Sequence, residues 1–225
     1  MKLDDTFDMV GADIVAPASV YTGPVAKGRQ RQRYLFARSF DILFALLAAP
    51  MVVAVALVLL VLNPIFNPGP LFFRQKRMGK DCTSFRMWKF RTMLPSSIDV
   101  RSHDAPLDRH RITQLGALLR KSRLDELPNL INVLRGEMAL VGPRPDAWDH
   151  AVVYIRTIPL YAQRFAVLPG ITGLAQVRSG YADDYKSVCR KARLDAIYVR
   201  NRSARMDTGI VFATVVVMLT GFGAR

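Results

Sequence analysis

The sequence has few of the residues on which disulfide-rich and zinc-binding proteins depend. It contains two cysteines, Cys82 and Cys189, which make no disulfide framework and lack the spacing of metal ligands. Its three histidines are scattered, without the partner spacing of a catalytic triad or a zinc site. The glycine-punctuated stretch 169–177 matches neither a dinucleotide fingerprint nor a P-loop. These absences indicate a reducing compartment and give no support to the common metal, triad or nucleotide-binding motifs.

Acidic residues are also scarce relative to basic ones. The 225 residues include 32 Lys and Arg against 18 Asp and Glu, a formal net charge of +14, although 51% of the residues are hydrophobic. A soluble enzyme rarely combines these two properties. The combination favours a protein held on an anionic membrane surface, or one that handles polyphosphates. Nucleic acid is the other standard partner of a basic chain and stays open at this point.

One long stretch of the chain carries no charge. As a straight helix, residues 42–62 would be about 31 Å long, enough to cross a bilayer core. Pro50 lies in the middle, where it should kink or break the helix. Basic residues flank the stretch on both sides, whereas the flanks of a crossing helix are expected to be asymmetric. We therefore favour a re-entrant helix-hairpin over residues 34–66, broken at Pro50, with both flanks in the cytoplasm.

The patterns outside this hairpin predict a mainly α, α/β membrane-associated domain. Residues 1–33 lack periodicity and predict a disordered tail, while 67–225 predict one membrane-surface domain. Apolar and basic residues alternate over 85–91, which predicts a half-buried strand in a small β element. Residues 210–222 are too short to span a membrane and should lie in the interface or pack on the domain. Further predicted elements are helices at 109–119, 148–167 and 183–200, the last amphipathic, and a glycine-rich loop at 169–177 running into a strand.

An acidic pair, Asp125-Glu126, lies among basic residues just before an apolar helical pattern. Because Pro128 is tolerated only in the first turn, we place the helix start near Asp125, with Asp125 or Ser122 as its cap. One interpretation is an acidic helix cap beside solvated charges. The other is a phosphate-handling site, in which a carboxylate attacks phosphorus or binds metal while arginines neutralise the phosphate. The expected apolar face consists of Leu127, Leu130, Ile131 and Leu134.

Five short motifs, taken together and in order, give the chain a family resemblance. It resembles the monotopic phosphoglycosyl transferases, the bacterial polyprenyl-phosphate sugar-1-phosphate transferases. The resemblance covers the chain from about residue 36 to its C-terminus. The motifs are Lys89-Phe90-Arg91-Thr92-Met93, Leu124-Asp125-Glu126-Leu127, Gly142-Pro143-Arg144-Pro145, Pro169-Gly170-Ile171-Thr172-Gly173 and Leu194-Asp195-x-x-Tyr198.

The resemblance implies transfer of a hexose-1-phosphate from a UDP-sugar to undecaprenyl phosphate with release of UMP. This reaction initiates the synthesis of exopolysaccharide, capsule or O-antigen-type glycans. Asp125 would be the nucleophile that forms a covalent phospho-sugar intermediate, and Glu126 would support it; both would hold Mg²⁺. Residues 67–225 would be a catalytic domain at the cytoplasmic face of the bacterial inner membrane. The residues implied around the substrate and its phosphates are Lys89, Arg91, Arg120, Arg144, Arg178 and Asp195.

The implied partners are a UDP-sugar, undecaprenyl phosphate and membrane lipids, without nucleic acid; a homo-oligomer is left open. Two positions depart from the family pattern. Ala49-Pro50 replaces the usual Ser-Pro at the helix break, and Gly180 stands where many relatives have an arginine, which Arg178 would have to replace. The main alternative is a membrane-tethered basic binding protein for nucleic acid or anionic lipid without catalysis, but two carboxylates weaken a polyanion surface. A second alternative is a bitopic enzyme in which 42–62 is a true span.

Overall fold

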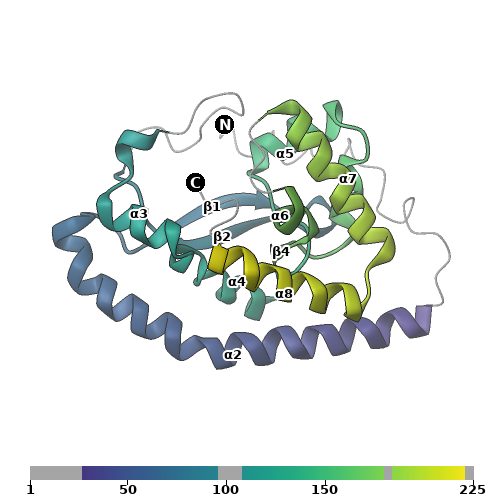
Figure 1. Cartoon of the computed structure of the whole chain (residues 1–225), viewed down its shortest axis with the longest axis horizontal. Coiled ribbons are helices and arrows are strands. Elements are labelled where there is room, and N and C mark those ends of the chain that lie inside the picture. Colours follow the sequence, from purple (N-terminus) through teal and green to yellow (C-terminus); the bar gives the residue numbers. More distant parts are fainter. Residues whose placement is uncertain (1–26, 96–107, 180–183, 221–225) are drawn as a thin grey trace, which may run out of the picture.

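The computed structural model describes residues 27–95, 108–179 and 184–220, with the backbone alone for 27–35. These residues form a mainly helical domain with two small sheets, as predicted, above one long helix (Figure 1). The predicted tail, except for its last residues, lies outside the described residues. The helices are α2 (Lys27–Phe66), α3 (Gln114–Lys121), α4 (Asn129–Arg135), α5 (Trp148–Thr157), α6 (Leu174–Ser179), α7 (Tyr185–Asn201) and α8 (Ala204–Thr220). The strands are β1 (Phe72–Met78), β2 (Ser84–Phe90), β3 (Ala139–Val141) and β4 (Gly170–Thr172). Short 3-10 turns are η2 (Lys80–Cys82), η3 (Arg109–Arg111), η4 (Leu124–Glu126) and η5 (Tyr161–Ala166).

Helix α2 does not break at Pro50, contrary to the expectation from the sequence. Its 40 residues run without interruption through Pro50 and Pro64, a length of about 60 Å. An internal proline removes one backbone hydrogen bond and can bend a helix without ending it. Figure 1 shows α2 as a curved helix along the lower side of the molecule, with its concave side towards the domain. The helix also begins at Lys27, so residues 27–33 belong to it and not to the predicted tail.

Helix α2 packs on the domain near both ends of its apolar stretch. Towards its N-terminal end, Asp41 Oδ1 accepts a hydrogen bond of 3.1 Å from the backbone N–H of Leu140. Just beyond its C-terminal end, Asn67 Nδ2 donates to the backbone oxygen of Arg91 at 2.8 Å. The stretch Phe36–Phe66 is long and apolar enough to cross a membrane. Of its most apolar 18-residue segment, 11% is buried in the domain. The remaining face therefore presents a large apolar surface.

Strands β1 and β2 form an antiparallel hairpin. Their register runs from Phe72 opposite Phe90 to Met78 opposite Ser84. The half-buried strand predicted over 85–91 is confirmed, because side chains on β2 alternate between buried and accessible over its first half. The buried side chains of Met87 and Phe90 face the core. The hairpin therefore carries Lys89, near its end, to the acidic pair.

Strands β3 and β4 form a short parallel pair that the sequence reading missed. The strand expected after the glycine-rich loop is instead helix α6, and the strand lies earlier, at Gly170–Thr172. The pairing depends on a close approach of two backbones. A Cβ atom on Gly170 would lie 2.1 Å from the backbone nitrogen of Gly142, and one on Gly142 would lie 2.5 Å from the oxygen of Leu168. Glycine at both positions lets the two strands meet and fixes the loop that follows β3.

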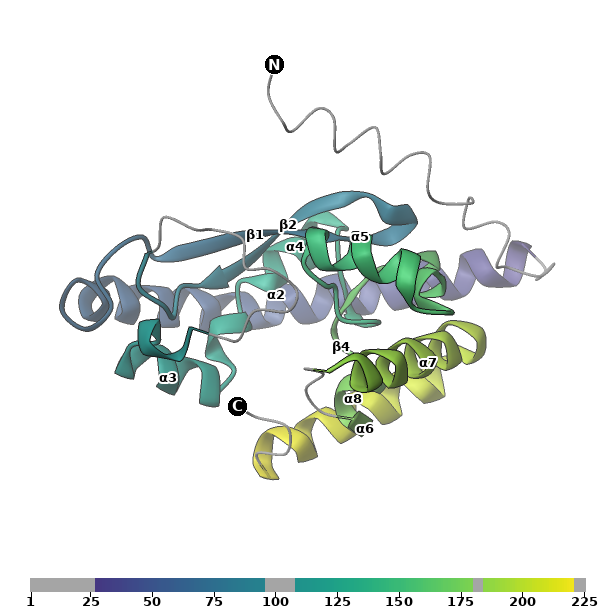
Figure 2. The same cartoon turned by 90° about the horizontal axis from the view of Figure 1, so that it is seen from above.

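The C-terminal helices lie on the opposite edge from the β1–β2 hairpin. Seen from above, the hairpin follows one edge and α7 and α8 the other, with α2 beneath (Figure 2). Helix α8 begins earlier than the predicted apolar run, at Ala204. It packs on the domain through Ile210, which is buried, and through Thr214, whose Oγ1 lies 2.7 Å from Thr172 Oγ1. Its outer side is apolar and exposed, with Phe212, Val215, Val216, Met218 and Leu219.

Candidate active site

The acidic pair lies in a 3-10 turn between α3 and α4, not in the first turn of an α-helix as predicted. Arg123 has a left-handed backbone (φ 59°). It separates the end of α3 from the 3-10 turn Leu124–Glu126. Helix α4 begins only at Asn129, with Pro128 at its N-cap. Ser122 is not an N-cap, since it ends α3 and its hydroxyl donates back to the oxygen of Leu118 at 2.9 Å.

The buried face of this segment is partly polar, not wholly apolar as predicted. Asp125, Asn129, Asn132 and Val133 follow one another at i, i+4, i+7 and i+8, and all four are buried. In the predicted apolar face Leu130 is buried, whereas Leu134 is 40% exposed. The apolar spacing does not predict this face, because two of its buried members are asparagines. The helix therefore turns carboxylate and amide groups into the protein.

Glu126 is fully engaged by two basic side chains. Arg144 binds both of its carboxylate oxygens, with Nη1 3.0 Å from Oε2 and Nη2 on Oε1. Lys89 Nζ lies 3.3 Å from Oε1. Burial alone would raise the pKa of Glu126, but Arg144 and Lys89 outweigh it and hold the pKa well below its usual range. Glu126 is therefore ionised and holds Lys89 and Arg144 beside Asp125.

Asp125 is in a different position. Its side chain is buried, and its Oδ1 atom has no hydrogen-bond partner among the residues that the structure describes. Burial raises the pKa of this carboxyl group, while the positive charges of Lys89, Arg144 and Arg120 oppose that rise. A buried carboxylate oxygen without a hydrogen bond is rare in folded proteins and calls for an explanation. The two adjacent acids therefore have different surroundings, and the prediction that they have separate roles stays a prediction.

The loop that carries Arg144 is held rigidly from below. Arg77 Nη1 donates to the oxygen of Pro145 at 2.9 Å, and Arg164 donates to the backbone oxygen of Arg144. The Arg144 side chain also donates to the oxygen of Ile171 on β4 at 3.3 Å. Two prolines restrict the backbone on either side of Arg144. Its guanidinium is therefore presented to the acidic pair by a prearranged loop.

A second group of charges lies beneath this loop. Asp146 accepts hydrogen bonds from Arg164, from Lys191 and from the hydroxyl of Tyr161. Asp195 Oδ2 lies 3.2 Å from Arg164 Nη2, close enough for an ion pair although it lacks hydrogen-bond geometry. We call Asp146, Arg164, Lys191 and Asp195 the buried charge cluster.

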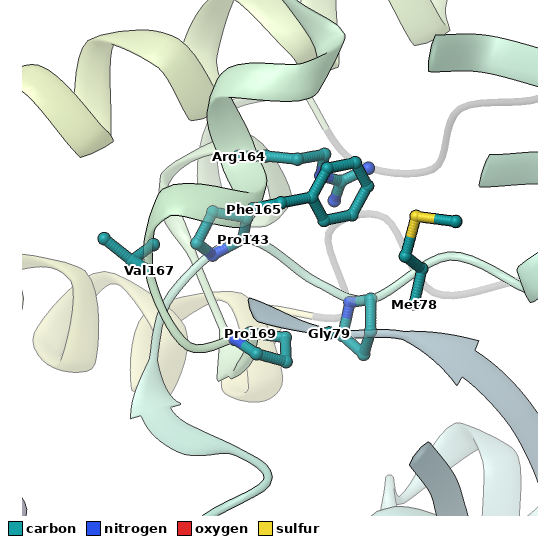
Figure 3. Close-up of a pocket in the computed structure, with 8 residues that line it drawn as sticks. Met78, Gly79, Pro143, Arg164, Phe165, Val167 and Pro169 are labelled. Carbon is teal, nitrogen blue, oxygen red and sulfur yellow. The ribbon is translucent and has the colours of Figure 1, made fainter. Parts of the chain in front are cut away.

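Asp195 therefore lies apart from the acidic pair. Its side chain is 1% exposed and its charge partner is Arg164. Local patterns could not reveal this cluster, because its members come from three separate segments and each alone resembles a surface charge. A small cavity lies beside it, lined by Arg164 and by apolar residues (Figure 3). Phe165 and Met78 face each other across that cavity, and neither member of the acidic pair lines it.

Two further predicted site residues have other surroundings. The Arg91 guanidinium is buried and donates to the backbone oxygens of Pro70, at 2.6 Å, and Met93, at 3.0 Å. It therefore ties the end of the hairpin to the loop after α2, and its donors are already engaged. Arg178 is exposed at the end of α6, and Gly180 lies outside the described residues.

Comparison with known sequences decides the family. The family described as "Bacterial sugar transferase" matches residues 32–221 of the chain. The chain belongs to the bacterial sugar transferases. It is 43% identical over 188 residues to the "UDP-N-acetylgalactosamine-undecaprenyl-phosphate N-acetylgalactosaminephosphotransferase" of Aeromonas hydrophila, covering 84% of this chain and 44% of that protein.

Two other relatives differ in how much of them the chain covers. The "Exopolysaccharide production protein PSS" of Rhizobium leguminosarum bv. phaseoli is 40% identical over 189 residues, with 81% of this chain and 94% of that protein covered. The "UDP-glucose:undecaprenyl-phosphate glucose-1-phosphate transferase" of Escherichia coli (strain K12) is 39% identical over 187 residues, with 80% of this chain and 39% of that protein covered. The chain therefore spans less than half of the Aeromonas and E. coli proteins and nearly all of the Rhizobium protein.

The Mg²⁺ implied by the resemblance can be tested against the oxygens that this bacterial sugar transferase offers. Among the described residues, no three His, Cys, Asp or Glu side chains gather into a metal-binding group. Mg²⁺, however, is commonly held by one or two carboxylates together with substrate phosphates and water. The unpartnered Oδ1 of Asp125 fits that sparse set of donors, whereas both oxygens of Glu126 already accept from Arg144.

Proposed function

We propose that the chain transfers a hexose-1-phosphate from a UDP-sugar to undecaprenyl phosphate, with release of UMP. The observation that carries the proposal is the buried, unpartnered carboxylate of Asp125 beside a Glu126 that is held by Lys89 and Arg144. The printed names of the Aeromonas and E. coli relatives support the reaction, and that of the Rhizobium relative supports a role in exopolysaccharide production. These names differ in the sugar, so the donor sugar is left to experiment.

Asp125 acts as the nucleophile in this proposal. One oxygen of its carboxylate attacks the phosphorus that bears the sugar, and the bond from that phosphorus to the oxygen of UMP breaks. Asp125 then carries the sugar phosphate as an acyl phosphate ester. A phosphate oxygen of the lipid attacks the same phosphorus, and Asp125 leaves as a carboxylate. Lys89, Arg144 and Arg120 favour the ionised form of Asp125 that the first step needs.

Lys89 and Arg144 give the site the positive charge that a diphosphate requires. Alone, two adjacent carboxylates would repel the incoming substrate. A guanidinium fork matches the oxygens of phosphate as well as those of carboxylate, so Arg144 can bind both. Glu126 fixes the two cations in advance, which lowers the reorganisation needed during transfer. When bound, Mg²⁺ would neutralise further phosphate charge, and the carboxylate of Asp125 is the described group best placed to help hold it.

The chain is proposed to lie on the cytoplasmic face of the inner membrane, with both ends of α2 on that side. Asp41 and Asn67, near opposite ends of the apolar stretch, both bind the same domain, which supports re-entry over a simple crossing. In intact cells, an impermeant thiol reagent should label neither Lys27→Cys nor Pro68→Cys. Labelling at one end alone would support the bitopic alternative. Both variants should react after permeabilisation, which controls for access of the reagent.

The decisive assay is UMP release by the full chain held in a nanodisc. The protein is given undecaprenyl phosphate, Mg²⁺ and a panel of UDP-sugars, beside an Asp125→Asn variant. Asp149→Asn, which changes an exposed aspartate on α5, is the matched control. We expect UMP with one sugar from the parent and the control, and none from Asp125→Asn. Release of UDP would mean cleavage of the sugar–phosphate bond and would contradict the mechanism.

A further inference from the structure

We propose that Asn129 is a positioning residue whose side-chain amide donates a hydrogen bond to Asp125 Oδ1 and fixes that carboxylate for attack. The inference rests on the proposed function, because it assumes that Asp125 is the reacting group. It assigns to α4 a part in the reaction beyond carrying the acidic pair. Asn129 itself would not touch the substrate.

The first support is the state of the Asn129 side chain. Asn129 is 0% exposed, and neither its Nδ2 nor its Oδ1 has a hydrogen-bond partner among the described residues. A buried amide normally finds partners for its polar atoms, and leaving them unpaired destabilises the fold. An apolar side chain of the same size would avoid that cost. The amide at this position therefore needs an explanation other than packing.

Asn132, on the same face of α4, shows what a structural asparagine looks like here. It is equally buried, but its Oδ1 accepts from the backbone N–H of Trp88 at 3.0 Å. Its Nδ2 donates to the oxygen of Arg86 at 2.8 Å and to Glu137 Oε2 at 2.7 Å. These bonds fasten α4 to β2. Asn129 has none of them, so the two asparagines serve different purposes.

The second support is the position of Asn129 relative to Asp125. The two residues are four apart in a segment whose turns are linked by backbone hydrogen bonds, among them Leu127 N to Leu124 O and Leu130 N to Leu127 O. Both side chains are on the buried face of the segment. Residues at this spacing lie on the same side of a helix, about one turn apart.

The chemistry of the two groups is complementary. Asp125 Oδ1 is an acceptor without a donor, and Asn129 Nδ2 is a donor without an acceptor. The two groups make no hydrogen bond to each other in this structure, so in the proposal a rotation of one side chain brings them into hydrogen-bond geometry when substrate binds. A neutral donor can orient a carboxylate without neutralising its charge. The second oxygen of Asp125 would then be left for the phosphorus.

The test compares Asn129→Leu with Asn132→Leu in the full chain, by thermal melting and by steady-state UMP release. Leucine has the same branched outline as asparagine, with a larger volume, and has no polar atoms. For Asn129→Leu we expect a melting temperature equal to or above that of the parent, since an unpaired buried amide is removed. We also expect kcat to fall by about tenfold or more while KM for the UDP-sugar stays within about twofold. Asn132→Leu should instead lower the melting temperature, because three hydrogen bonds are lost.

Asn129→Gln is the conservative variant, since it keeps the amide on a longer side chain. It keeps a polar group in the buried site and has one more side-chain torsion to fix, so it should melt below Asn129→Leu, yet its kcat per folded molecule should exceed that of Asn129→Leu. Full turnover in Asn129→Leu would overturn the proposal, as would a loss of turnover that only follows a loss of folded protein. If the parent itself releases no UMP with any donor, the proposed function fails and this inference fails with it.

Discussion

Two groups of charges lie on either side of the Gly-Pro-Arg-Pro loop, and they differ in how completely their members are paired. The acidic-pair site contains Lys89, Asp125, Glu126 and Arg144, and the buried charge cluster contains Asp146, Arg164, Lys191 and Asp195. Each group thus has two acids and two bases. Each group also has one carboxylate that accepts several hydrogen bonds, Glu126 or Asp146, and one with an oxygen that accepts none among the described residues, Asp125 or Asp195. The difference is that Asp195 Oδ2 still lies 3.2 Å from Arg164 Nη2, whereas Asp125 forms no ion pair with the described residues.

The difference teaches which aspartate is available for chemistry. Although burial opposes its ionisation, Lys191 and Arg164 hold the pKa of Asp146 well below the usual range. Burial raises the pKa of Asp125, and no hydrogen bond to Oδ1 offsets it. A fully paired carboxylate stabilises the fold and is a poor nucleophile, because its lone pairs are already used. An unpaired one destabilises the fold and keeps an oxygen free to react.

The largest expected effect is a contrast between the Asp125 and Asp146 variants: the first should lose activity and keep its stability, and the second should do the opposite. Asp125→Asn should reduce UMP release by about a thousandfold or more, because the proposed nucleophile is removed, without lowering the melting temperature. Asp146→Asn should lower the melting temperature but retain most of its turnover per folded molecule. UMP release and thermal melting of both variants in the same detergent measure the contrast. If Asp146→Asn loses turnover while fully folded, the cluster is part of the chemistry and the distinction fails.

The next effect is on stability and comes from Arg164. Arg164→Met would leave the buried carboxylate of Asp195 and the partly buried carboxylate of Asp146 without their shared cation. Breaking a buried charge group in this way costs about 3–5 kcal/mol, which corresponds to a fall of about 10 °C in melting temperature for a chain of this size. Arg178→Met, at an exposed position, is the matched control and should change stability by less than about 0.5 kcal/mol. Equal melting temperatures for the two variants would show that the cluster does not hold the loop.

A smaller effect is expected from Arg144→Lys. Lysine keeps the charge but loses the fork that binds both oxygens of Glu126. We expect kcat/KM to fall by about 10–100-fold, with little change in melting temperature. Arg111→Lys, where a partly exposed arginine pairs with Asp108, is the control and should leave kcat/KM unchanged. Unchanged turnover in Arg144→Lys would mean that charge alone, without the bidentate contact, is sufficient.

Sequence patterns predicted the parts of the molecule whose signal is local. The uncharged stretch became α2, the alternating residues became β2, and the acidic pair lies beside Lys89 and Arg144 as expected. Patterns failed where a distant partner decides the outcome. The buried face of α4 contains Asn132, for example, because its amide bonds the backbone of Trp88 and Arg86 on β2.

The buried charge cluster could not be predicted for the same reason. Asp146 follows the Pro-Arg-Pro turn, whereas Lys191 and Asp195 lie on α7, and no periodicity connects them. In the sequence, Arg164 looks like an ordinary solvated charge, but its side chain is 2% exposed. The family resemblance implies that Asp195 lies near the substrate, and in the structure its ion-pair partner is Arg164. Local sequence patterns do not reveal which charged residues are paired when the partners lie far apart along the chain.

The smallest effect is a difference of sign in the pH dependence of stability. The lowered pKa of Asp146 means that its contribution is present above the unfolded value of about 4 and is lost as pH falls towards the folded value. The raised pKa of Asp125 does the opposite: its ionised form destabilises the fold above the folded value, and this cost disappears as pH falls towards about 4.

Asp146→Asn should therefore reduce the slope with which the free energy of unfolding falls at acid pH, by at most about 1.4 kcal/mol per pH unit. In the parent, protonation of Asp125 adds to the free energy of unfolding as the pH falls. Asp125→Asn removes this contribution, so the free energy of unfolding should fall more steeply on acidification. Denaturant unfolding of the parent and both variants between about pH 3 and 7 measures the three slopes. Parallel curves for the two variants would show that the two aspartates have the same electrostatic surroundings, and the contrast between site and cluster would then rest on geometry alone.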